Sequence, residues 1–186
     1  MRLRLRDGKP CRRMACRAFS KAKCSNCLWT GERRGDNQNA MKAIRKDQPK
    51  ITGVIIVTHT DYGERLLAAA QLILGQQGGC RSIPVDVTSN VEETVRTIKT
   101  AIQDTDTGNG ALILTDMFGG TPTNLSLSLL GTAHIEVITG VNLPMLLKVF
   151  GSRHLPPADL AREAKKAGVQ GIVVAGEVLR QKIADG

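Results

Sequence analysis

Residues 110–122 read GALILTDMFGGTP, and this stretch decides the fold. Its first part, residues 110–116, is apolar up to the last two positions, which is typical of a strand buried on both faces of a parallel sheet. Two glycines then allow a tight turn, Thr121 is a good helix N-cap, and Pro122 suits the first helical position. We therefore expect a strand, a turn and a helix over residues 121–130.

The same alternation of strand and helix continues on both sides of this stretch. Short β-branched runs predict strands, and apolar residues repeating at helical spacing predict helices. Pro84 has no N–H, so its strand is expected toward an edge of the sheet. Further strands are expected at residues 51–58, 82–87, 135–139 and 171–175, and further helices at 66–74, 91–102, 143–150 and 158–167.

This alternation predicts an α/β fold, a doubly wound, mainly parallel sheet with helices on both faces. For a domain of about 130 residues the flavodoxin-like strand order 2-1-3-4 is favoured over the larger dinucleotide-binding order. The first and third strands are then neighbours, and their carboxyl ends flank the point where the chain reverses direction across the sheet. Ligands and chemistry are expected at that point.

The first 50 residues differ in composition from the rest. Residues 1–50 hold 15 Lys and Arg against 4 Asp and Glu, a net charge of +11, whereas residues 51–186 carry −2. No regular period is present, so we interpret this segment as a basic, disordered extension or as a mis-assigned start, with Met41 as the alternative. Four of the five cysteines lie here at spacings that fit a zinc ribbon poorly, so no metal is expected.

Composition excludes several classes of protein. No apolar stretch approaches the roughly 18–20 residues of a membrane helix, and aromatic residues make up only 3%, too few for nucleic-acid stacking platforms. The P-loop, the GxSxG elbow and a GxGxxG after the first strand are all missing. Cys80 is the lone cysteine after residue 50, so disulfides do not organise the domain and a cytoplasmic location is expected.

Three loops meet at the carboxyl ends of the strands: residues 58–61 (THTD), 115–122 and 139–142 (TGVN). The topology places His59 opposite Asp116. A neutral imidazole can act as a nucleophile, and a carboxylate on its other ring nitrogen fixes the tautomer and stabilises the cation formed on attack. Each residue also has a plain structural interpretation, because single buried histidines, loop acids and glycine turns are common.

Together these residues predict a phosphohistidine site. His59 is the nucleophile, Asp116 orients it, and the helix that begins after the glycine turn points free N–H groups at the transferred oxygens. Nothing in this set requires a metal or a cofactor. The residues expected around the phosphoryl group are Thr58, Gly119, Gly120 and Thr121.

Residues 58–59 (TH), 114–124 (LTDMFGGTPTN) and 138–147 (ITGVNLPMLL) resemble the mannose family of IIA domains of the bacterial phosphoenolpyruvate:sugar phosphotransferase system. The resemblance covers residues 51–150 strongly and 151–183 loosely. It implies a mannose-type EIIA domain over residues 51–183.

The resemblance further implies a phosphotransferase, a phosphocarrier for sugar uptake. Phospho-HPr would donate the phosphoryl group to Nε2 of His59, with Asp116 on Nδ1 and the Thr121 hydroxyl on the phosphoryl oxygens. The acceptor would be a histidine of a separate IIB subunit that serves a membrane permease. The family is homodimeric and exchanges its terminal strand, here residues 171–175. Thr60 stands where the family often has Gly, and this bulkier neighbour can alter partner docking.

A site that binds two partner proteins in turn would need a flat, largely apolar rim around His59. Methionine suits such a rim because its flexible side chain adapts to more than one partner. Helix packing is the structural alternative for Leu143 and Met145, and we expect it for at least one of them. The rim residues are expected to be Tyr62, Met117, Phe118, Asn142, Leu143 and Met145.

Two related functions stay open: a regulatory phosphohistidine acceptor, and the IIA-like phosphoryl donor of a dihydroxyacetone kinase. An aspartyl-phosphate receiver would need an acidic pair after the first strand and a Lys near the last one, and only Asp61 is present. A flavin carrier would need more aromatic residues. Nucleic-acid binding would rest on residues 1–50 alone and is not expected for the folded domain.

Overall fold

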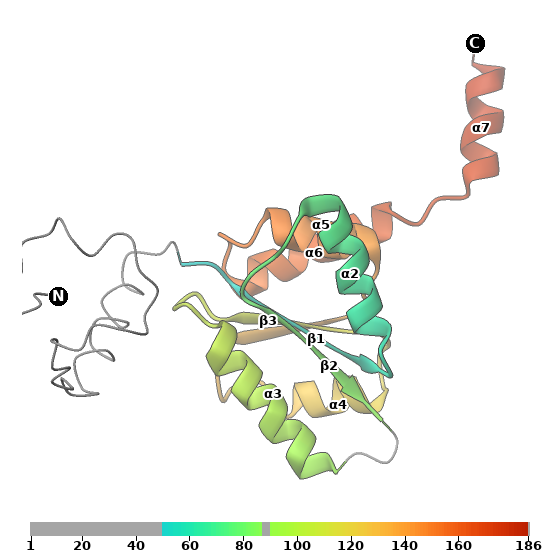
Figure 1. Cartoon of the computed structure of the whole chain (residues 1–186). Helices are drawn as coiled ribbons and strands as arrows, with labels where there is room; N and C mark the ends of the chain where they lie inside the picture. The colour runs from blue at the N-terminus through green and yellow to red at the C-terminus, as the bar shows by residue number, and fades with distance from the viewer. Residues whose placement is uncertain (1–49, 87–89, 186) are drawn as a thin grey trace, which may run out of the picture. The chain divides into compact units, whose positions relative to one another are not determined.

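The computed structural model describes residues 50–86 and 90–185 (Figure 1). Its core is one four-stranded sheet in the order β2-β1-β3-β4, and all three neighbouring pairs are parallel. This confirms the predicted strand order. The basic segment predicted over residues 1–50 lies outside the described residues except for Lys50. The strands are β1 (Gly53–His59), β2 (Cys80–Val85), β3 (Ala111–Thr115) and β4 (Ile135–Thr139).

The two central strands are buried on both faces, which is why their sequences are almost continuously apolar. Every residue of β3 is buried, and so is every residue of β1 except His59 at its end. Ile56 is in register with Leu114 and Val57 with Thr115, so β1 and β3 end side by side. The residues that follow these strands are thereby brought together.

Helices cover both faces of the sheet, as Figure 1 shows. One face packs against α2, α5 and α6 around Ile56, Leu114 and Leu146. The other face packs against α3 and the segment of α4 around Ile55 and Ile113. The helices are α2 (Tyr62–Leu74), α3 (Val91–Thr105), α4 (Thr121–Leu127), α5 (Leu143–Gly151), α6 (Pro157–Gln170) and α7 (Ala175–Ala184). None of the helices within the described ranges is long and apolar enough to cross a membrane.

A buried arginine connects three segments at the amino ends of the strands, opposite His59. The Arg153 guanidinium donates hydrogen bonds to the carbonyls of Thr52, Gly78 and Gly79, at 2.8, 2.6 and 2.7 Å. The residue is only 6% exposed. Burial lowers the pKa of Arg153 from its ordinary value, and the three carbonyls stand in for a counter-ion.

The prediction that α6 ends before Gly168 was wrong. Gly168 lies inside the helix and is buried. A Cβ atom placed on Gly168 would lie 2.7 Å from Cε of Met145, so the glycine lets α6 pack closely on α5. A helix-interior glycine of this kind serves packing, and sequence alone does not distinguish it from a C-cap.

The strand predicted at residues 171–175 is also absent from the described chain. Residues 171–174 belong to no helix or strand, and Ala175 already begins α7. A strand needs a neighbour for its N–H and C=O groups, and this segment has none within one chain. The edge position predicted for Pro84 is confirmed, because β2 is an outer strand.

Candidate functional site

His59 and Asp116 form a hydrogen-bonded pair at the carboxyl ends of the two central strands. His59 is the last residue of β1, and Asp116 follows β3 directly. Nδ1 of His59 lies 2.7 Å from Oδ2 of Asp116, and the backbone N–H of His59 donates to the same oxygen at 2.9 Å. The structure therefore brings these two residues together as the topology predicted.

The second carboxylate oxygen of Asp116 is also engaged. Oδ1 accepts a hydrogen bond from the backbone N–H of Met117 at 2.9 Å. Burial by itself would raise the pKa of Asp116, but the hydrogen bonds from His59 and Met117 and the nearby imidazole outweigh it, so the pKa of Asp116 lies below its ordinary value. Asp116 is thus an ionised acceptor at neutral pH.

An ionised acceptor at Nδ1 determines the protonation of the ring. The proton of a neutral His59 must sit on Nδ1, where Asp116 accepts it, and Nε2 then carries a lone pair. The His59 side chain is 42% exposed. No hydrogen-bond partner for Nε2 occurs within residues 50–86 and 90–185. This nitrogen is therefore available to a reagent that arrives from outside.

Gly120 lies against the imidazole on the Nε2 side. A Cβ atom placed on Gly120 would lie 2.8 Å from Cε1 of His59 and 3.5 Å from Nε2. Any side chain at this position would push the ring aside. Gly119 precedes it with a φ of +81°, a conformation that favours glycine. Close contact with the ring thus requires glycine at residue 120, and the backbone conformation favours glycine at residue 119.

Thr121 and Thr58 have different surroundings. The structure places the α4 N-cap at Gly120, one residue before the predicted Thr121, with no side-chain capping bond. The exposed Thr121 hydroxyl makes no hydrogen bond within the described part of the chain, so it is free to meet a ligand. Thr58 is fully buried, and its Oγ1 accepts a hydrogen bond from the Gly63 N–H at 2.8 Å. Thr58 therefore holds the start of α2 and does not reach the surface.

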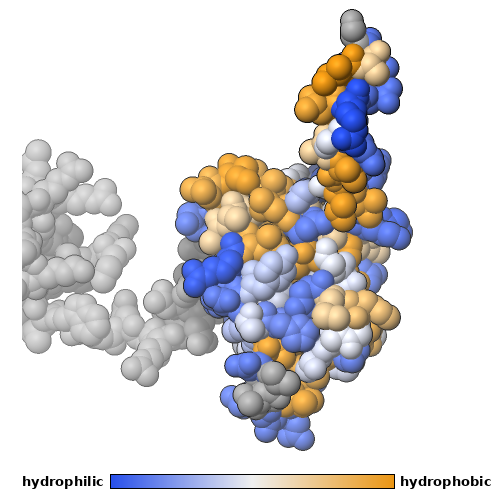
Figure 2. Space-filling model, turned by 90° about the vertical axis from the view of Figure 1, so that its right-hand side faces the viewer, coloured by the Kyte–Doolittle hydropathy of each residue, from blue (hydrophilic) through white to orange (hydrophobic). Residues whose placement is uncertain are grey.

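Three of the predicted rim residues are exposed. Met117 is 56% exposed, Phe118 78% and Tyr62 43%, and the Tyr62 hydroxyl donates to the Val141 carbonyl at 3.1 Å. Figure 2 shows hydrophobic groups bordering a polar region on the side toward which the strands point in Figure 1. Met117 and Phe118, which follow Asp116 directly, and Tyr62, at the start of α2, are thus exposed hydrophobic side chains close in sequence to the two strand ends.

Two other predicted rim residues have structural roles. Met145 is 4% exposed and packs in the core, so its assignment to the rim was wrong and helix packing is its role. Asn142 caps α5 by accepting from the Met145 N–H, and it donates to the Gly168 carbonyl at 3.1 Å. Its side-chain groups are therefore used within the fold.

Sequence reasoning missed the conformation of Thr60. This residue has a φ of +50°, the left-handed region that favours glycine, and it alone does so among the described non-glycine residues. The strain falls on the residue directly after His59. The signal was available, since Thr60 stands where the resembled family often has Gly.

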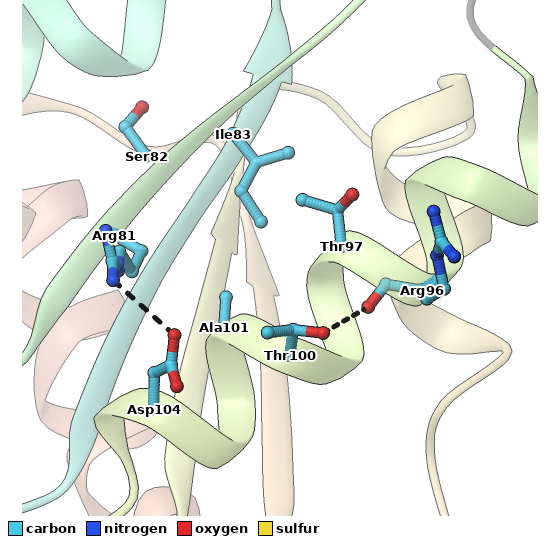
Figure 3. Close-up of a pocket in the computed structure, with 8 residues that line it drawn as sticks. All are labelled: Arg81, Ser82, Ile83, Arg96, Thr97, Thr100, Ala101 and Asp104. Atoms are coloured by element: carbon cyan, nitrogen blue, oxygen red, sulfur yellow. Dashed lines mark hydrogen bonds and ion pairs between the residues drawn. The ribbon is translucent and has the colours of Figure 1, made fainter.

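A cleft of about 520 Å³ lies between β2 and α3, away from His59 (Figure 3). Arg81 and Asp104 point toward one another across it, with 3.4 Å between Nη2 and Oδ2. Ser82 points away from it in the same view. Arg81 is in register with Ile55, nearer the start of the strand, so this cleft does not belong to the histidine site.

No cluster of three or more His, Cys, Asp or Glu that could hold a metal occurs in the part of the chain that the structure describes. Among the described residues, His59 and Asp116 therefore have no third His, Cys, Asp or Glu placed to complete a metal site with them.

A family model described as "PTS system fructose IIA component" matches residues 53–164. The chain belongs to the mannose family of phosphotransferase-system IIA components. Its fold agrees with that of EIIA from Streptococcus agalactiae, with a TM-score of 0.62 and 27% identity over 68% of this chain and 99% of that one.

Curated relatives agree with this assignment. The mannose-specific EIIAB component of Escherichia coli K12 is 33% identical over 122 residues, which is 64% of this chain and 38% of the relative. The fructose-specific EIIA component of Bacillus subtilis is 30% identical over 130 residues, 69% of this chain and 89% of the relative. The chain thus spans about two fifths of the length of the E. coli protein and most of the B. subtilis one.

Proposed function

We propose that this chain is a cytoplasmic phosphocarrier of the sugar phosphotransferase system. His59 accepts a phosphoryl group from phospho-HPr and passes it to a histidine of a IIB protein. The observation that carries the proposal is the hydrogen bonding of the His59 ring. Nδ1 of His59 is hydrogen-bonded to Asp116 at 2.7 Å, Nε2 has no hydrogen-bond partner within the described chain, and the side chain is 42% exposed.

The transfer is a displacement at phosphorus. The Nε2 lone pair of His59 attacks the phosphorus atom of the donor phosphohistidine, the donor's N–P bond breaks, and its imidazole leaves with the electron pair. The His59 ring gains positive character, and Asp116 stabilises it through Nδ1–H. The same steps with His59 as the leaving group pass the phosphoryl group onward. The reaction needs no redox partner.

The turn before α4 supplies the surroundings of the transferred oxygens. Gly120 leaves space beside Nε2, and the free Thr121 hydroxyl can donate to a phosphoryl oxygen. The first hydrogen bond of α4 runs from the Asn124 N–H to the Gly120 carbonyl at 3.0 Å, so earlier N–H groups have no partner inside the helix. These donors support the proposed role of the turn.

A homodimer is part of the proposal. Ile172, Val173 and Val174 are 77%, 59% and 62% exposed, and the following helix α7 has no buried residue. Figure 1 shows α7 apart from the sheet and its covering helices. A second copy of the chain would give residues 171–174 a strand to pair with and would cover their side chains. Light scattering on the full chain measures the mass that decides this.

The test uses the full chain with phosphoenolpyruvate, the general first enzyme of the system and HPr. We expect label that is stable to alkali and labile to acid, and we expect His59→Ala to lose it. His134→Ala and His154→Ala are matched controls at exposed histidines, and both should keep full labelling. Full labelling of His59→Ala would refute the proposal.

The acceptor is tested separately. Adding a mannose-family IIB protein should remove the label from His59. A regulatory acceptor or a donor to dihydroxyacetone kinase would share the first step, and would be recognised by retention of the label with IIB or by its loss to the kinase subunits.

A further inference from the structure

The turn that carries Asp116 is held by two buried threonine hydroxyls that the proposed chemistry does not use. Thr115 ends β3, Thr123 lies in the first turn of α4, and both are fully buried. Their Oγ1 atoms lie 2.7 Å apart, and Thr123 Oγ1 lies 2.6 Å from the Met117 carbonyl oxygen. This pair is therefore attached to the residue that follows the acid.

The direction of these hydrogen bonds follows from the number of protons. A carbonyl oxygen only accepts, so Thr123 donates its single hydroxyl proton to Met117. Thr123 must then accept from Thr115, which is the donor of the pair. The result is a directed chain from Thr115 through Thr123 to Met117, and each bond polarises the next.

Met117 is held at both of its backbone groups. Its carbonyl accepts from Thr123, and its N–H donates to Oδ1 of Asp116 at 2.9 Å. The other carboxylate oxygen of Asp116 receives the backbone N–H and Nδ1 of His59. Hydrogen bonds thus link the buried threonines to the imidazole by way of the Met117 backbone and the Asp116 carboxylate.

We propose that Thr123 is a positioning residue for phosphoryl transfer. Its hydroxyl fixes Met117, Met117 orients the Asp116 carboxylate, and the carboxylate keeps the His59 proton on Nδ1 so that Nε2 remains the nucleophile. Thr123 also belongs to the helix whose N-cap, Gly120, lies against the ring. This inference rests on the proposed function, but its first consequence is a property of the unphosphorylated ring.

The test compares three variants of the full chain. Thr123→Val keeps the shape of the side chain and removes the hydroxyl, whereas Thr123→Ser restores it. Thr105→Val is the matched control, because Thr105 is also buried and donates to the Ala101 carbonyl at 2.7 Å within α3. Two quantities are measured on each: the ¹⁵N NMR signals of the His59 ring, which report the tautomer, and the rate of phosphoryl transfer from phospho-HPr.

We expect Thr123→Val to change the ring from the single Nδ1–H tautomer to a mixture and to lower the transfer rate roughly tenfold, the usual size of an effect acting through an orienting group. Thr123→Ser should keep the wild-type tautomer and a rate within about twofold of wild type. Thr105→Val should change neither quantity, even where it lowers the melting temperature.

Several results would overturn the inference. They are a wild-type tautomer in Thr123→Val, a changed tautomer with an unchanged rate, or the same loss of rate in Thr105→Val. If Thr123→Val does not fold, Thr115→Val replaces it. That variant leaves the bond from Thr123 to Met117 in place, so a smaller change of tautomer in the same direction is expected, and no change would contradict the inference. A wild-type chain that takes no label would refute the proposed function, while its ring signals would still test Thr123.

Discussion

The reactivity of His59 depends on where one proton lies. Asp116 accepts three N–H groups, two of them from His59, and these bonds keep the pKa of its carboxyl below the ordinary value. An acceptor that stays ionised can hold the ring proton on Nδ1 throughout the neutral range. Under the proposed function, His59 would therefore be in its nucleophilic tautomer before a partner protein binds.

Asp116→Asn tests this arrangement. The amide removes the negative charge and can place an NH₂ group against Nδ1, which would move the ring proton to Nε2. We expect phosphoryl transfer from phospho-HPr to slow by roughly a hundredfold, within the usual range for such a group, and the chain to stay folded. Rapid-quench measurement of the labelled chain gives the rate. An unchanged rate would remove Asp116 from the mechanism.

The same pair predicts a pH dependence of stability. A carboxyl whose pKa is lowered by folding stabilises the folded chain above its unfolded pKa, and this contribution is lost as the pH falls through the folded value. Wild type should therefore be more stable than Asp116→Asn at pH 7, and the difference should shrink progressively at acid pH, below the ordinary aspartate pKa of about 4. Urea unfolding of both chains from pH 7 to pH 3 measures it, and a constant difference would contradict the argument.

Thr60 is strained in the structure, and the strain can be removed. A left-handed conformation destabilises a non-glycine residue by roughly 1–2 kcal/mol. Glycine removes this cost, but part of the gain in stability is offset because glycine raises the conformational entropy of the unfolded chain. Thr60→Gly should raise the free energy of unfolding by up to about 1 kcal/mol. Thr60→Ala keeps a Cβ atom and is the control. An equal gain from alanine would show that the threonine side chain, and not the backbone, is the source.

The two ends of the sheet have different roles. At the carboxyl end the loops carry the histidine site. At the other end, Arg153 joins the loop before α6 to the segments that precede β1 and β2. Its role is therefore expected to be structural and separate from the chemistry.

Arg153→Met should lower the free energy of unfolding by about 2–4 kcal/mol, because three buried carbonyls lose a charged donor. Arg153→Lys keeps the charge but cannot reach all three carbonyls, and it should recover only part of the loss. Urea unfolding measures both variants. Phosphoryl transfer, measured well below the melting temperature, should stay within about twofold of wild type, and a large loss of rate would show that the two ends of the sheet are coupled.

Some elements of the fold were predictable from the sequence and others were not. The parallel sheet was predictable because β1 and β3 are almost continuously apolar, and the meeting of His59 with Asp116 followed from the strand order alone. Helix packing was predicted for at least one of Leu143 and Met145, but not which, since exposed and buried residues on a short apolar helix share one pattern. Gly168 was misinterpreted because a packing glycine and a C-cap glycine look alike.

The hydroxyl chain through Thr123 was beyond sequence reasoning for another reason. It depends on distances of 2.6 and 2.7 Å between groups on a strand, a turn and a helix, and residue patterns do not specify such distances. The missing strand at residues 171–175 has a third cause. The pattern of β-branched residues is present, but residues 171–174 pair with neither outer strand, β2 or β4, within the described chain.

For the molecule as a whole, the folded domain and the basic segment are expected to be independent. The net charge of +11 lies in residues 1–50, while residues 51–186 carry −2. A chain beginning at Gln48 should fold. It should accept the phosphoryl group from phospho-HPr at a rate within about twofold of that of the full-length chain. Labelling kinetics compare the two chains, and a failure of the shorter one would show that the first 47 residues contribute to the site.

The central claim is that the Nε2 atom of His59 forms a bond with phosphorus. The most direct measurement is NMR of the ¹⁵N-labelled chain after phosphorylation by phospho-HPr, in which coupling between phosphorus and the ring identifies the bonded atom. The structure predicts one phosphoryl group on Nε2 of His59, with Nδ1 still hydrogen-bonded to Asp116. A phosphoryl group on Nδ1, on the Asp116 carboxylate or on another histidine would contradict the claim.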